Sequence, residues 1–163
     1  MRTPQDKDLF KIQQSPKLLK VDQKLFHSTV MRILYYASRV WPDLLCTATC
    51  LTMRTRLGTA SEDDKNRLLY VLHFIHTTQH DGIILGGESH GVLRLRVYAD
   101  ASYGVHMDGK SHTGIVITLG RGLIYCKSSK QKPATKSSCK AEILALSDII
   151  PTVTWIRDFI TIF

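Results

Sequence analysis

Two carboxylates, those of Asp100 and Glu142, have the residue type and the sequence surroundings that a metal site requires. Asp100 closes a segment, 93–100, in which apolar and polar residues alternate, as they do in a half-buried β-strand. Glu142 falls in the first turn of a predicted helix that follows two more strands. If this helix packs across the sheet, the two carboxylates can share a hard divalent cation, which prefers oxygen ligands. Solvated surface acids are the other interpretation, and spacing alone leaves it open.

A basic block follows Asp100 along the chain. Residues 110–141 contain seven Lys or Arg side chains and no Asp or Glu, within a chain of formal net charge +8. Such a positive field favours a polyanionic partner. A solvated charged face is the alternative. The candidates for contacts with nucleic-acid phosphates are the lysines nearest to Glu142, namely Lys127, Lys130, Lys132, Lys136 and Lys140.

Histidines and cysteines offer weaker candidates. His73, His76 and His80 have the i, i+3, i+7 spacing that metals can use on a helix, but no cysteine or acidic ligand accompanies them, so ordinary surface histidines are expected. The four cysteines form no CxxC pair, and we expect them to be reduced thiols.

The elements that must position these side chains begin with helices. Apolar residues between 26 and 37 recur at i, i+4, i+7, i+8 and i+11, which predicts one buried helix face. Pro42 ends that helix and begins a second one that runs to about Arg56. Ser61, followed by three acidic residues, is typical of a capping box. A third helix is therefore expected from Ser61 to Gly82.

After Gly82 the period of the apolar residues changes to two, which predicts strands. A polar basic loop over 128–138 leads to a final helix, capped by Ser137 or Ser138. Pro151 is expected to kink or end that helix. The predicted strands are 93–100, 115–119 and 123–127, and a short additional strand at 83–85 also fits.

Together these patterns predict an α+β chain in three parts. A loosely ordered polar arm spans 1–23, with one helical turn near Leu18. A helical segment spans 24–81, and a β-β-β-α unit spans 82–163. Length and composition, 163 residues with 44% hydrophobic, suffice for a buried core. No apolar run reaches the roughly 18–20 residues of a membrane helix, and no signal peptide opens the sequence, so we expect an intracellular location, in the cytoplasm or nucleus.

Several short motifs, in order and with matching spacing, resemble the ribonuclease H domain of copia-type retrotransposon polyproteins. They are Tyr98-Ala-Asp-Ala-Ser102, Lys110-Ser-His-Thr-Gly114, Ser128-Ser-Lys-Gln-Lys132 and the run from Ser137 to Ser147. Upstream, Leu34-Tyr-Tyr-Ala37, Trp41-Pro-Asp43 and the stretch from Leu68 to Thr77 look like the segment that joins reverse transcriptase to that domain. The resemblance covers about residues 15 to 163.

This resemblance implies a helical connection segment followed by the first half of a ribonuclease H-like domain. Such domains cut the RNA strand of an RNA–DNA hybrid with carboxylates that hold two magnesium ions. Asp100 and Glu142 match the first catalytic Asp and the catalytic Glu, and the family's remaining carboxylates would follow Phe163. Lys140 stands where the family usually has an acidic residue. We therefore expect only a remnant of the Mg²⁺ site, with weak metal binding or none.

Three functional hypotheses follow. The first is a fragment of a retrotransposon Pol polyprotein, of ribonuclease H and reverse transcriptase ancestry, that is inactive alone. The second is a non-catalytic basic module that binds an RNA–DNA hybrid or another nucleic acid. The third is a nuclease completed by another polyprotein chain. No membrane partner is expected.

Overall fold

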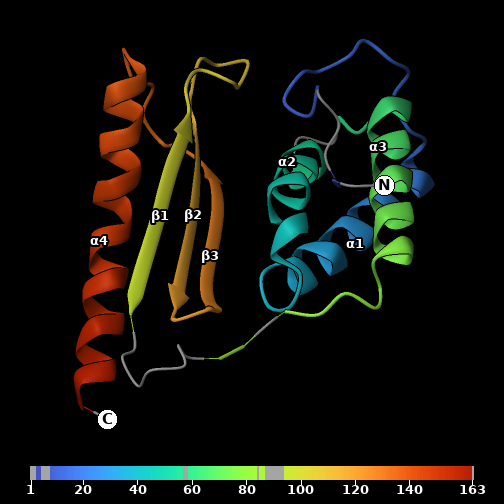
Figure 1. The fold of residues 1–163 in the computed structure, drawn as a ribbon. Helices are drawn as coiled ribbons and strands as arrows, with labels where there is room; N and C mark the ends of the chain where they lie inside the picture. The colour runs from blue at the N-terminus through green and yellow to red at the C-terminus, as the bar shows by residue number, and fades with distance from the viewer. Residues whose placement is uncertain (1–2, 5–7, 57–58, 84, 87–93, 163) are drawn as a thin grey trace. The chain divides into compact units, whose positions relative to one another are not determined.

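The computed structural model describes residues 3–4, 8–56, 59–83, 85–86 and 94–162. The chain divides into two compact units, Met1–Gly82 and Ile83–Phe163. Helices form the first unit, and a three-stranded sheet with one helix forms the second (Figure 1). The predicted α+β class is confirmed. None of the helices in the described ranges is both long enough and apolar enough to cross a bilayer.

The first unit contains α1 (Lys20–Ala37), the short 3-10 helix η1 (Pro42–Leu44), α2 (Leu45–Arg56) and α3 (Glu62–Thr77). Phe26, Val30, Ile33 and Ala37 form the buried face of α1, as their spacing predicts.

The start of α3 confirms the predicted capping box. The Ser61 hydroxyl accepts from the backbone N–H of Asp64, and the Asp64 carboxylate accepts from the N–H of Ser61. The helix ends at Thr77, earlier than predicted. The Thr77 and Thr78 hydroxyls both donate to the carbonyl of Phe74, which satisfies the last turn locally.

The N-terminal arm is more ordered than expected at some of its described residues. Leu9 and Leu18 are buried. The backbone of this arm is tied to the segment before α3, because Leu18 N–H donates to the Ala60 carbonyl and Glu62 N–H donates to the Pro16 carbonyl. Two buried leucines and these backbone hydrogen bonds hold the arm in place. The polar composition of the arm did not indicate either feature. Helix α1 also begins inside the predicted arm, at Lys20.

The second unit contains β1 (Leu95–Ser102), β2 (His112–Leu119), β3 (Gly122–Lys130) and α4 (Ser138–Ile162). The strands are antiparallel, in the order β1-β2-β3. Strand β3 continues to Lys130, so the predicted loop begins three residues later than expected, because Ser128–Lys130 pairs with His112–Gly114. Ile83 and Leu85 lie outside any strand, whereas position 84 and the predicted strand residue Leu93 lie outside the described residues.

Helix α4 packs on one face of the sheet, mainly against β1 (Figure 1). Ile149 and Ile156 of α4 form a core with Ile115 and Ile117 of β2. Pro151 was expected to kink or end the helix. The helix runs through Pro151 to Ile162, so Pro151 does not end it. Proline has no N–H, so the helix loses one hydrogen bond at this position. Apolar packing of α4 on both sides of the exposed proline compensates for the lost stability.

Candidate carboxylate pair and lysine surface

Asp100 lies near the C-terminal end of β1, on the face that α4 does not cover. Side chains alternate along a strand, and Leu95, Val97 and Ala99 pack into the core beneath α4. The side chain of Asp100 therefore leaves β1 on the opposite face, where it is exposed. Its neighbour across the sheet is Gly114, which is also exposed and has no side chain, so the surface beside the carboxylate is open.

Glu142 lies near the start of α4, where Ser137 acts as the cap. The Ser137 hydroxyl accepts from the N–H of Lys140 at 3.3 Å, which decides between the two predicted capping serines. The Ser138 hydroxyl donates to a Glu142 carboxylate oxygen at 3.3 Å. Glu142 is exposed.

A cluster of three alanines joins these two regions. Ala101 of β1 packs with Ala141 and Ala145 of α4, and all three are buried. Because each carboxylate is the sequence neighbour of one of these alanines, the backbones at Asp100 and Glu142 are held near each other. Small side chains permit this close approach of helix and strand. Convergence of the carboxylate groups themselves stays a prediction.

The donor set does not fit a paired-magnesium centre. Within the described ranges no three His, Cys, Asp or Glu side chains gather where they could hold a metal ion. Two divalent ions close together need several negative ligands, and Asp100 and Glu142 are only two groups, one of which projects from the face away from α4. Weak binding of a single cation by these residues stays a prediction.

The five candidate lysines fall into two groups. Lys127 and Lys130 lie on β3 and are partly buried, whereas Lys132, Lys136 and Lys140 are exposed on the following loop and the first turn of α4. The exposed group therefore forms a contiguous basic stretch of chain that leads into the helix bearing Glu142.

Lys130 already has an acidic partner. Its ammonium lies 2.7 Å from a carboxylate oxygen of Asp108, and the Lys110 ammonium lies 3.7 Å from the same oxygen. The hydrogen bond from Lys130 lowers the pKa of the Asp108 carboxyl below its usual value, so Asp108 carries its negative charge at neutral pH. Asp108 thus compensates part of the positive charge that the sequence places at this surface.

A buried polar network lies at the same end of the sheet and was not predicted from the sequence. The rings of His106 and His112 share a hydrogen bond of 3.1 Å, and His112 shares another of 2.7 Å with the Ser128 hydroxyl. Both rings are buried. The only indication in the sequence is the polar run Ser111-His112-Thr113 directly before an apolar strand.

Gln131 connects this end of the sheet to α4. Its side-chain amide nitrogen donates to the Thr113 hydroxyl at 3.0 Å and to the Ala141 carbonyl at 2.9 Å, and its backbone N–H donates to the carbonyl of Ser111. Gln131 is buried. It therefore fixes the first turn of α4, directly before Glu142, against β2.

The histidines and cysteines were the weaker candidates in the sequence. The described part of the chain contains no metal-holding group built on His73, His76 or His80. None of the four cysteines forms a disulfide. A hydrogen bond with Cys46 raises the pKa of the Cys50 thiol, and burial raises it further to a smaller extent. A raised thiol pKa is typical of an inert core cysteine.

Comparison with known proteins places the chain near two plant transposon proteins. It is 29% identical over 153 residues to the Retrovirus-related Pol polyprotein from transposon RE2 of Arabidopsis thaliana, and 27% identical over 153 residues to that from transposon RE1. The matches cover 90% of this chain but only 10% of each relative, so the chain spans about a tenth of their length. No protein-family model and no solved structure matches. The chain is thus distantly similar to one part of retrotransposon Pol polyproteins.

Proposed function

We propose that this chain is a piece of a retrotransposon Pol polyprotein whose second unit is of ribonuclease H type, binds nucleic acid through phosphate contacts, and does not cleave it alone. The observation that carries the proposal is the match of 153 residues to Pol polyproteins. The packing of α4 on β1, which holds the backbones of the two candidate carboxylates near each other, supports it.

Binding is assigned to the exposed lysines around the start of α4. The loop and the first turn of α4 that carry Lys132, Lys136 and Lys140 contain no Asp or Glu. The N-terminal N–H groups of a long helix also favour phosphate oxygens nearby. Contacts of this kind neutralise phosphates without reading bases. An RNA–DNA hybrid and a DNA duplex should therefore bind with similar, salt-sensitive affinity.

We assign no cleavage activity to this chain when it acts without a partner chain. Asp100 and Glu142 are the matched carboxylates, but two groups supply too little negative charge to hold a pair of magnesium ions. The chemistry that magnesium supplies in such enzymes, stabilisation of the attacking and leaving oxygens, needs that pair. The two carboxylates here bind a cation weakly at most.

A direct test incubates the purified chain with a labelled RNA–DNA hybrid in magnesium or manganese. We expect binding in a mobility-shift assay and no cleavage above background. The variants Asp100→Asn and Glu142→Gln serve as probes, and Asp148→Asn, an exposed acid on α4, is the matched control. Cleavage that both probes abolish and the control retains would refute catalytic silence. Absence of hybrid binding at low salt would refute the binding role.

A nuclease completed by another chain is the second candidate. Within the described residues β1 is a terminal strand of the sheet, paired on one side only, and an unpaired edge can accept a strand from another chain. A strand added there would lie beside Asp100. Cleavage that rises more steeply than in proportion to chain concentration would favour this assembly, whereas silence at every concentration would exclude self-completion.

A further inference from the structure

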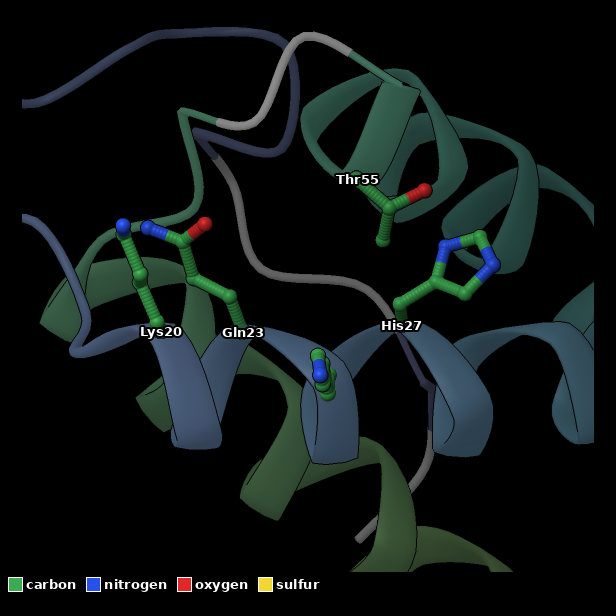
Figure 2. A pocket seen from close by; sticks show the side chains of 5 residues that line it. Lys20, Gln23, His27 and Thr55 are labelled. Atoms are coloured by element: carbon green, nitrogen blue, oxygen red, sulfur yellow. The ribbon is translucent and has the colours of Figure 1, made fainter.

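A pocket in the first unit lies outside every site discussed above. It is open to solvent, has a volume of about 400 Å³, and is lined by residues of α1 and α2: Lys20, Gln23, Lys24, His27 and Thr55. Figure 2 shows Lys20, Gln23 and His27 rising from α1 towards the end of α2, where Thr55 closes the opposite wall.

Among the described residues, the lining is cationic on one side and contains no acid. Residues at i, i+4 and i+7 lie on the same face of a helix, so Lys20, Lys24 and His27 share one stripe of α1. The nearest acid on this helix is Asp22, which lies about 200° around the helix axis from Lys20 and does not line the pocket. No carboxylate among the described lining residues therefore balances the charges of Lys20 and Lys24.

The start of α1 adds to this positive potential. Leu19 occupies the cap position, and no side chain caps the first turn. Lysines in a first turn lie at the positive end of the helix dipole, where negative groups are favoured instead. An anion bound at the stripe would neutralise Lys20 and Lys24 and would also interact favourably with the dipole.

The polar groups of the wall restrict the ligand further. The Thr55 hydroxyl already donates to the Thr52 carbonyl at 2.8 Å, and the Gln23 amide donates to the Leu18 carbonyl at 2.9 Å. The groups left to contact a ligand are mainly the two ammonium groups and the imidazole. Such a set suits a ligand that carries several acceptor oxygens and more than one negative charge.

We propose that this pocket binds a phosphate group. A phosphate monoester carries about −1.5 to −2 charges at neutral pH and three strong acceptor oxygens, which matches a set of two ammonium groups and an imidazole better than a single carboxylate does. The phosphate can belong to a nucleic-acid backbone or to a free polyphosphate. This site is independent of the lysines of the second unit, and its failure would leave the proposed function untouched.

The test titrates the 163-residue chain with tripolyphosphate at constant ionic strength and follows the NMR signals of residues 20–27. We expect saturable shifts at Lys20, Gln23 and His27. The double variant Lys20→Gln/Lys24→Gln should weaken binding about 5- to 30-fold, since each exposed ion pair contributes little. Lys65→Gln removes a partly buried lysine of α3, which lies outside the pocket and 3.7 Å from a Glu62 carboxylate oxygen, and should leave the affinity unchanged.

A second variant separates binding from folding. Gln23→Glu places a negative charge in the pocket and gives up the hydrogen bond to the Leu18 carbonyl, while its carboxylate interacts favourably with the dipole at the helix start. We expect it to abolish binding in a chain whose circular-dichroism spectrum shows unchanged helix content. A single-stranded oligonucleotide that shifts the same signals and competes with tripolyphosphate identifies a nucleic-acid backbone as the source, and tripolyphosphate binding without such competition identifies a free polyphosphate. Equal loss of binding in Lys65→Gln and in the double variant, or no shift at the pocket residues, would overturn the proposal.

Discussion

The pairing of Lys130 with Asp108 changes how the lysine surface should respond to salt. Each phosphate neutralised by a lysine contributes about 0.7–0.9 to the slope of log affinity against log salt concentration. The three exposed lysines, Lys132, Lys136 and Lys140, therefore predict a slope of about −2 to −3 for a nucleic-acid duplex. Lys130 should add little, because the Asp108 carboxylate at 2.7 Å already neutralises its ammonium and repels phosphates.

Substitutions of the exposed lysines, of Lys130 and of Asp108 should change the salt slope by different amounts. Lys132→Gln/Lys136→Gln should flatten the slope by about 1.4–1.8, as two phosphate contacts are lost. Lys130→Gln should flatten it by less than half as much as Lys136→Gln does. Asp108→Asn should steepen it by about 0.7–0.9, because Lys130 is then free to contact a phosphate.

Fluorescence anisotropy with a labelled RNA–DNA hybrid, measured across a series of salt concentrations, supplies the slopes. The same series with a DNA duplex should give parallel lines, since the contacts do not read bases. A slope that Lys130→Gln and Lys136→Gln flatten equally, or that Asp108→Asn leaves unchanged, would show that the ion pair does not restrain Lys130.

Three further predictions concern stability and reactivity in the second unit. Pro151→Ala should stabilise the second unit by about 2–3 kcal/mol, because alanine restores the missing N–H in a continuous helix. Urea unfolding, followed by the fluorescence of Trp155 in a chain without the other tryptophan, measures this gain. No gain would mean that the helix does not continue through position 151. Ile117→Ala should cost about 2–5 kcal/mol in the same assay, because Ile117 is fully buried, and a cost below 1 kcal/mol would contradict this core. With a thiol reagent at neutral pH, exposed Cys139 should react before Cys126, because burial raises the pKa of the Cys126 thiol; the reverse order would be contrary to this geometry.

Local patterns account for most of the elements. The apolar spacing in α1, the capping box of α3 and the alternation in β1 each act through near neighbours in the sequence, so the printed residues suffice to predict them. The elements that differ from prediction depend on partners far along the chain. Strand β3 extends to Lys130 because β2 pairs with it, and α4 passes Pro151 because the sheet packs against it on both sides of the proline.

The candidate sites show the same division. Residue type and order were enough to single out Asp100, Glu142 and the five lysines. Only the packed unit showed that Asp100 leaves β1 on the face away from α4, and that Lys130 is held by Asp108. The pocket between α1 and α2 was not expected at all, because it joins a stripe of one helix to a threonine of another.

By itself, the sequence determined the order and type of the elements, the position of the basic block and the similarity to Pol polyproteins, because periodicity, charge and motif spacing are properties of neighbouring residues. The tertiary structure alone decided which face each side chain occupies, which lysine is already paired, and which buried polar groups hold α4 against the sheet. Those outcomes depend on contacts such as Gln131 to Ala141 and Ala101 to Ala145, whose partners come from different elements and are brought together only by packing.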